Sequence, residues 1–135
     1  MNDQIIAIVD DDALVRQSVQ RLVRSMGFRA DQYSSTEEFL GSASLPDVCC
    51  IISDVNLANG KASRLQAHLA SIGYDLPVVF MTARKDRSVE AKLMQAGAIH
   101  VLAKPFSQDE MARCIAAALQ RNSRARPEAA LTSSS

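Results

Sequence analysis

Residues 5–15 read IIAIVDDDALV, in which five apolar residues precede three consecutive aspartates and the start of a segment with helical spacing. The run IIAIV is short and apolar throughout, which is typical of a strand buried on both faces. Strands of this kind occur in parallel sheets that helices cover on both sides, so the stretch favours an α/β fold. Adjacent like charges repel, and three carboxylates at a strand end therefore need an explanation of their own.

The alternation of strand and helix continues along the chain. Apolar or partly polar runs predict further strands over 28–33, 48–53, 77–82 and 99–103. Apolar residues at helical spacing predict helices over 14–26, 35–40, 61–72, 86–95 and from 107 to about 121. Five strands alternating with five helices predict a doubly wound parallel sheet.

Local signals mark several helix boundaries. Gly27, Gly73 and Gly97 each follow a periodic segment and are expected to end it. Ser35 and Ser107 each stand three residues before a glutamate, which is the Ser-x-x-Glu pattern of a capping box.

The composition indicates one ordinary globular domain. The chain has 135 residues, of which 47% are hydrophobic and 22% charged, and its formal net charge is zero. A neutral chain argues against nucleic acid as a partner of this domain. No apolar stretch approaches the roughly 18 residues that span a bilayer, and the first apolar run lacks the basic flank of a signal peptide. We therefore expect no membrane association.

The three cysteines carry no metal-binding spacing. Cys49 and Cys50 are adjacent on a predicted strand, where neighbours point to opposite faces, so a bridge between them is not expected. With Cys114 they predict reduced, mostly buried thiols in a cytoplasmic protein. Residues 123–135 are rich in Ser, Ala and Arg and predict a flexible tail after a domain formed by residues 1–122.

Reactive side chains follow the predicted strands. Ligands of open parallel sheets lie beyond the carboxyl ends of the strands, where the sequence places Asp10, Asp11, Asp54, Thr82 and Lys104. Carboxylate clusters bind hard cations such as Mg²⁺, which offset the charge of an incoming phosphoryl group. One carboxylate can then form an aspartyl-phosphate, and the lysine and hydroxyl can bind the phosphoryl oxygens. The pattern predicts phosphoryl transfer onto a carboxylate.

The same residues carry a resemblance to a known family. The paired acids, the lone Asp54, the Thr82-Ala83 pair and the run Lys104-Pro105-Phe106 occur in this order. Over residues 4 to about 121 the chain resembles the receiver domain of bacterial two-component response regulators. The resemblance implies a flavodoxin-like (βα)5 fold with strand order 2-1-3-4-5.

The resemblance also implies roles for individual residues. It implies Asp54 as phosphoacceptor, Thr82 as switch hydroxyl and Lys104 as the phosphoryl-binding cation. For Mg²⁺ it implies the pair Asp10 and Asp11, with Asp11 favoured as the direct ligand, together with Asp54 and the backbone carbonyl of Asn56. Asp12 stands where the first helix begins, and its side chain is expected to cap that helix.

The implied partners are proteins. The usual phosphoryl donor is a phosphohistidine on a sensor histidine kinase or a histidine phosphotransfer protein. A second copy or an effector would bind the surface of the fourth helix, fifth strand and fifth helix. On this reading the chain is no enzyme beyond its own phosphorylation and dephosphorylation, and it either stands alone or is part of a longer regulator.

Three departures from the family pattern keep alternatives open. The run 54–60 lacks the usual proline and is about two residues short, Val101 replaces the usual aromatic, and Arg84 stands two residues past Thr82. A receiver-like interaction module that is poorly or not phosphorylated is therefore the main alternative. A phosphatase of the haloacid dehalogenase type would need an aspartate where Asn56 stands. A flavin module would need a glycine-rich loop in place of the acidic turn.

Overall fold

A computed structural model describes residues 4–42, 45–55 and 62–125 of the chain. Its five strands form one sheet in the order β2-β1-β3-β4-β5, and all four strand pairs are parallel. The predicted doubly wound sheet and its strand order are confirmed. The elements are β1 (Ile5–Val9), α1 (Ala13–Ser25), β2 (Arg29–Tyr33), α2 (Thr36–Leu40), the 3₁₀ turn η1 (Leu45–Asp47), β3 (Val48–Asp54), α3 (Ala62–Ser71), β4 (Val78–Thr82), α4 (Arg87–Gln95), β5 (His100–Ala103) and α5 (Gln108–Ala125).

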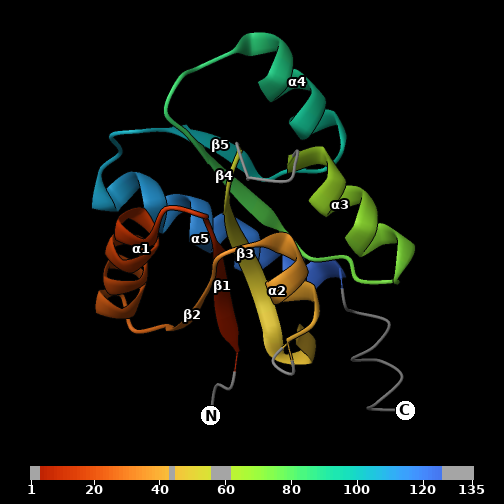
Figure 1. The fold of residues 1–135 in the computed structure, drawn as a ribbon, viewed down its shortest axis with the longest axis horizontal. Helices are drawn as coiled ribbons and strands as arrows, with labels where there is room; N and C mark the ends of the chain where they lie inside the picture. Colours follow the sequence, from red (N-terminus) through yellow and green to blue (C-terminus); the bar gives the residue numbers. More distant parts are fainter. Residues whose placement is uncertain (1–3, 43–44, 56–61, 126–135) are drawn as a thin grey trace.

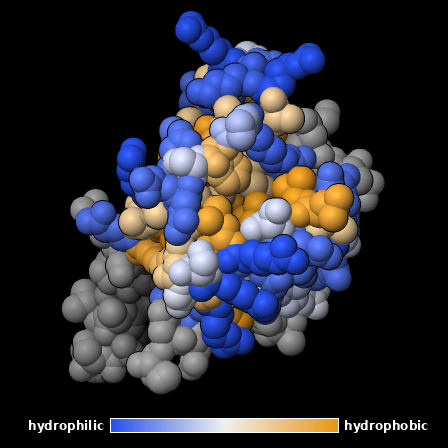
Figure 2. Space-filling model, turned by 90° about the vertical axis from the view of Figure 1, so that its left-hand side faces the viewer, coloured by the Kyte–Doolittle hydropathy of each residue, from blue (hydrophilic) through white to orange (hydrophobic). Residues whose placement is uncertain are grey.

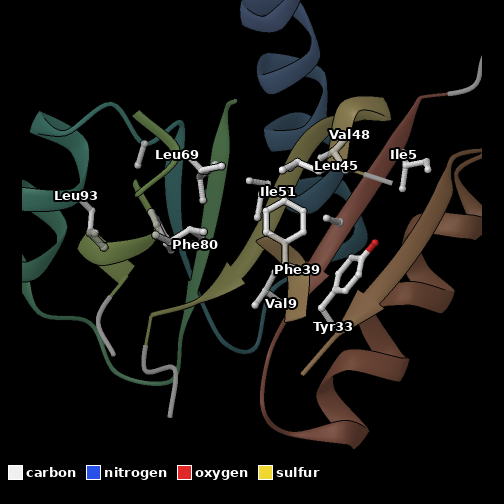
Figure 3. Close-up of a cluster of buried hydrophobic side chains, with 14 of the residues drawn as sticks. Ile5, Val9, Tyr33, Phe39, Leu45, Val48, Ile51, Leu69, Phe80 and Leu93 are labelled. Carbon is white, nitrogen blue, oxygen red and sulfur yellow. The ribbon is translucent and has the colours of Figure 1, made fainter. Parts of the chain in front are cut away.

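Helices cover the sheet on both faces, which explains why its central strands are apolar throughout (Figure 1). Val19 and Val23 of α1 and Ile115 of α5 belong to one buried cluster. The opposite cluster takes side chains from α2, α3 and α4 and is drawn in Figure 3. In it the rings of Tyr33 and Phe39 meet edge to face, with centroids 5.4 Å apart. None of the helices described is long and apolar enough to cross a membrane.

The predicted helix boundaries follow from local chemistry. Gly27, Gly73 and Gly97 have positive φ angles of 95°, 85° and 109°, which glycine adopts without a Cβ penalty. At the start of α5 the Ser107 hydroxyl accepts from the Glu110 N–H, and the Glu110 carboxylate accepts from the Ser107 N–H. This is a complete capping box.

The first capping box differs in one half. Ser35 caps α2 through the Glu38 N–H, as predicted, but the Glu38 carboxylate accepts from the N–H and hydroxyl of Ser34. These hydrogen bonds lower the pKa of Glu38. The spacing located the helix start correctly, while the carboxylate binds the residue before the cap.

The expectation that Cys49 and Cys50 point to opposite faces is wrong. Ile5 pairs with Val48 and Ile6 with Cys50, so the register shifts at a bulge that leaves Cys49 unmatched. Both thiols consequently pack in the cluster beneath α1 and α5. Neither of them forms a disulfide, nor does Cys114, and burial raises the pKa of the Cys50 thiol.

Three apolar residues of the predicted helices do not reach the core. Leu14 in α1 is 78% exposed, Ile72 just after α3 is 45% exposed, and Met94 in α4 is 44% exposed. Helix α5 runs to Ala125, past the end expected near Arg121, because nothing before Pro127 disfavours helical backbone. Of the tail predicted over 123–135, residues 123–125 belong to α5 and the rest lies outside the described residues.

Candidate functional site

The predicted reactive residues stand at the carboxyl ends of four strands. Asp10 follows β1 directly, Asp54 and Thr82 are the last residues of β3 and β4, and Lys104 follows β5. Since β1, β3, β4 and β5 are consecutive parallel neighbours, their carboxyl ends share one edge of the sheet. The Val55 N–H donates to the Met81 carbonyl and continues the ladder past Asp54.

Three carboxylates converge at this edge. Asp10, Asp11 and Asp54 each offer an oxygen, and these oxygens lie within 4.8 Å of one another. Asp10 and Asp54 are buried, whereas Asp11 is exposed. The site therefore has a buried floor of negative charge and one carboxylate at its mouth.

All the polar atoms of Asp10 except the carboxylate oxygen Oδ2 are hydrogen-bonded to neighbouring residues. Its N–H donates to the Tyr33 carbonyl, its own carbonyl accepts from Arg16, and its Oδ1 accepts from the Asp12 N–H at 2.8 Å. Its Oδ2 is buried and has no hydrogen-bond partner among the described residues, although Lys104 Nζ lies 3.9 Å away. Burial raises the pKa of Asp10, and the neighbouring Asp54 charge adds to the rise against the opposing Asp12 hydrogen bond.

A lysine and a hydroxyl complete the edge. Lys104 Nζ lies 3.3 Å from Asp54 Oδ1, and the Lys104 N–H donates to the Thr82 carbonyl at 2.8 Å. The Thr82 hydroxyl donates to the Arg84 carbonyl at 2.7 Å and accepts from the Arg84 N–H at 3.2 Å. The hydroxyl is thus bound to the β4–α4 loop.

The third aspartate of the acidic run has the capping role that we predicted. Asp12 has extended backbone, and its side chain accepts from the N–H groups of Leu14 and Val15 at the start of α1. Asp10 and Asp11 belong to the converging carboxylates, so two of the three consecutive aspartates lie in the acidic cluster and the third caps a helix.

The donor set fits a hard divalent cation. All the converging ligand atoms are carboxylate oxygens, the type that Mg²⁺ prefers, and Asp10 carries a buried oxygen, Oδ2, that has no hydrogen-bond donor among the described residues. The further ligand implied for the loop after β3, the carbonyl of Asn56, lies outside the described residues.

An apolar groove borders the site. It lies between α1 and the β5–α5 loop, and Leu14, Val15, Leu22, Pro105 and Phe106 line it together with Lys104. Figure 2, which views the molecule from the side of α1 in Figure 1, shows apolar side chains gathered in the middle of this face within a hydrophilic border.

Sequence reasoning missed two side chains at the acidic turn. Arg16 donates to the Asp10 carbonyl at 2.7 Å, and Gln32 of β2 accepts from Arg16 Nε at 3.0 Å. Arg16 stands four residues after the capping Asp12, so it could have been considered from spacing alone. Nothing in the sequence near Gln32 indicates this contact.

The parallel sheet with strand order 2-1-3-4-5 places the chain in the flavodoxin-like class of doubly wound α/β domains, and its acidic cluster lies at the carboxyl edge where ligands of this class bind. The chain belongs to the response regulator receiver domain family, whose model matches residues 6–116. It is therefore a receiver domain of the two-component signalling type.

Individual relatives agree with this assignment. Response regulator protein TmoT of Ectopseudomonas mendocina is 35% identical over 122 residues, covering 89% of this chain and 56% of TmoT. Nodulation protein W of Bradyrhizobium diazoefficiens is 34% identical, covering 90% and 54%. This chain thus spans about half the length of these curated relatives.

Solved structures give the same answer for the fold. A response regulator receiver protein from Burkholderia phymatum is 38% identical with a TM-score of 0.75, covering 87% of this chain and 95% of that one. The response regulator StyR is 30% identical with a TM-score of 0.85, covering 97% of this chain and 66% of StyR.

Proposed function

We propose that Asp54 accepts a phosphoryl group from a phosphohistidine on a sensor histidine kinase or histidine phosphotransfer protein. One observation carries the proposal. The Asp54 carboxylate is mostly buried at a strand end, with Lys104 Nζ at 3.3 Å and the oxygens of Asp10 and Asp11 within 4.8 Å. Such a setting holds a nucleophile, a phosphoryl-binding cation and ligands for a metal ion in one place.

Asp54 is the only group of this chain that the proposed transfer joins covalently to phosphorus. An Asp54 oxygen attacks phosphorus, an O–P bond forms, and the P–N bond of the donor breaks with its electron pair left on the imidazole. Lys104 lies beside the attacking carboxylate and binds the transferred oxygens. Thr82, released from Arg84, offers a hydroxyl to the same group.

Mg²⁺ is the proposed cofactor, with Asp10, Asp11, Asp54 and the Asn56 carbonyl as its ligands. When bound, the ion neutralises charge on the phosphoryl oxygens that the carboxylates would otherwise repel. On this proposal the catalysis of the chain is limited to its own phosphorylation and dephosphorylation.

The apolar groove supports a protein donor. Lys104 lines both the groove and the acidic site, so a partner that brings a phosphohistidine to Asp54 also covers the groove. Leu14, 78% exposed, offers it an apolar contact. A second surface, on α4, β5 and α5, is proposed for an effector or a second copy and includes a shallow cleft lined by His100, Glu110 and Arg113.

The cellular setting is also part of the proposal. The named relatives come from bacteria, and none of the three cysteines forms a disulfide, which suits a reducing cytoplasm. A bacterial, cytoplasmic phosphoprotein is the setting in which such a donor and Mg²⁺ are available.

Phosphorylation by a small donor tests the role of Asp54. Wild type, Asp54→Asn and Asp47→Asn are incubated with acetyl phosphate and Mg²⁺, and their intact masses and modified peptides are measured. Asp47 precedes β3 at its opposite end and provides the matched control. Wild type and Asp47→Asn should gain one phosphoryl group, and Asp54→Asn should gain none.

The outcomes separate the two candidate functions. A phosphorylated Asp54→Asn protein would assign the acceptor elsewhere. A wild type that takes phosphate from neither acetyl phosphate nor a phosphohistidine protein would favour the interaction module, which the short 54–60 run and Val101 keep in view.

A further inference from the structure

The backbone at Asp10 is fixed from both sides. Its N–H donates to the Tyr33 carbonyl at 3.1 Å, and its carbonyl accepts from Arg16 NH1 at 2.7 Å. The side-chain Oδ1 is also occupied, by the Asp12 N–H. The remaining oxygen, Oδ2, is buried and accepts no hydrogen bond among the described residues. Its orientation is therefore set by these three contacts.

The contact with Arg16 also determines where Asp11 points. The Asp10 carbonyl and the Asp11 N–H belong to one planar peptide unit, so holding the carbonyl fixes the direction in which the Asp11 Cα leaves it. Asp11 is exposed and stands at the mouth of the acidic cluster. The position of its carboxylate therefore depends on the backbone that the Arg16 side chain helps to hold.

Arg16 is itself oriented by a chain of amide hydrogen bonds. Arg16 Nε donates to Gln32 Oε1 at 3.0 Å, and Gln32 Nε2 donates to Gln20 Oε1 at 2.8 Å. Gln20 Nε2 then donates to the Ala30 carbonyl on edge strand β2. The chain links α1 to β2 and presents the guanidinium to the acidic turn in one direction.

The guanidinium also brings charge to the turn. Arg16 is partly buried, and its positive group lies against the carbonyl that joins two adjacent aspartates. Lys104 approaches the carboxylates of Asp10 and Asp54 from the β5 side. Asp10 thus lies between two cations, one at its backbone carbonyl and one near its carboxylate, and both oppose the repulsion within the acidic cluster.

We propose that Arg16 is a positioning residue for the cation site: it holds the Asp10–Asp11 peptide in the orientation that admits Mg²⁺, and Gln32 holds Arg16. The inference rests on the proposed Mg²⁺ site and adds to it a residue that touches neither the ion nor the phosphoryl group. Removal of such a supporting contact typically weakens metal binding by about 10–100-fold.

The matched pair for the test is Arg16→Met and Arg24→Met. Both arginines lie on α1 and donate to a main-chain carbonyl. Arg24 binds the Ala30 carbonyl, where Gln20 still donates after the change, and no contact of Arg24 with the acidic turn occurs among the described residues. Titration calorimetry with Mg²⁺ should show at least about tenfold weaker binding for Arg16→Met and unchanged binding for Arg24→Met. Thermal unfolding in EDTA gives the purely structural effect of each change.

A second variant keeps the inference testable if Arg16→Met does not fold. Gln32→Leu preserves side-chain size, removes the acceptor of Arg16 Nε and leaves all carboxylates in place. It should weaken Mg²⁺ binding in the same direction, by less. In metal-free NMR spectra it should also shift the amide resonances of Asp11 and Asp12, which Arg24→Met should not do.

The outcomes distinguish this inference from the proposed function. No Mg²⁺ binding by wild type, or equal binding by wild type and Asp11→Ala, would overturn the cation site itself. Binding that Asp11→Ala abolishes but that both Arg16→Met and Gln32→Leu retain at wild-type strength would overturn the positioning role alone.

Discussion

In metal-free buffer, Asp11→Ala and Asp12→Ala should change stability in opposite directions, although the two aspartates are adjacent and carry the same charge. Asp11 belongs to the converging carboxylates, whereas Asp12 caps α1 through the N–H groups of Leu14 and Val15. The experiment measures thermal unfolding of both variants and wild type, in EDTA and with Mg²⁺ at ten times its dissociation constant.

Electrostatics gives the size of the Asp11 effect without metal. Two unit charges at 4.8 Å, the upper limit of the separations between these carboxylate oxygens, repel by about 0.9 kcal/mol in water and about 3.5 kcal/mol at an effective dielectric constant of 20. Asp11 is exposed and screened, so the lower end applies. Asp11→Ala should therefore raise the free energy of unfolding in EDTA by about 1 kcal/mol.

With Mg²⁺, wild type should become more stable than Asp11→Ala. An ion that binds only the folded state at tenfold excess stabilises wild type by about 1.4 kcal/mol, or about 4 °C in Tm for a domain of this size. Asp11→Ala should lose most of that response. Asp12→Ala should keep it, while losing about 1 kcal/mol in both buffers because the helix cap is gone.

The result that would refute this reasoning is an equal Mg²⁺ response in wild type and Asp11→Ala. It would place the cation elsewhere. A stabilised Asp12→Ala in EDTA would equally show that repulsion along the acidic run, and not capping, dominates at that position.

Two further predictions concern Asp10 and Val101. In metal-free buffer, Asp10→Asn should have the same free energy of unfolding as wild type below the ordinary aspartate pKa of about 3.9. It should become the more stable protein as pH rises through the raised pKa of Asp10, because burial penalises only the ionised carboxylate. Urea unfolding at several pH values checks this. With beryllofluoride, NMR shifts should concentrate at residues 54–60 and 83–87 and be small in α5, whereas Val101→Tyr should extend them into α5; equally large shifts in α5 of wild type would contradict this.

The sequence was sufficient for the parts of the fold that depend on local patterns. Apolar or partly polar runs located all five strands, and glycines after periodic segments located helix ends at Gly27, Gly73 and Gly97, where φ is positive. Because parallel strands end at a common edge, the strand assignments alone also brought Asp10 and Asp54 into one neighbourhood.

Details that depend on tertiary contacts were out of reach. The bulge between β1 and β3 places Cys49 and Cys50 in one cluster, and strand periodicity cannot reveal a register shift. The contact of Arg16 with Asp10 depends on how α1 packs beside β1 and β2. Leu14 is exposed because it lines the open groove between α1 and the β5–α5 loop. The apolar spacing of α1 alone cannot show that this position faces a groove and not the core.

The NMR shifts are expected to concentrate in the loops because of the Thr82 hydroxyl and the Val101 side chain. The Thr82 hydroxyl is engaged by both the carbonyl and the N–H of Arg84, so turning it toward a phosphoryl group on Asp54 breaks two hydrogen bonds of the β4–α4 loop. That loop leads directly to Asp86, which caps α4, and the change can therefore reach α4 along the backbone.

The route through β5 is different. Val101 is buried beside its β4 partner Phe80, and a β-branched side chain has few rotamers and no ring to move. A phosphoryl group shifts a conformational equilibrium only by the difference in its interactions with the two states. Val101 supplies little of that difference, so the free energy of phosphorylation should act mainly on the β4–α4 loop and α4, and a partner that senses the phosphorylated state should contact them.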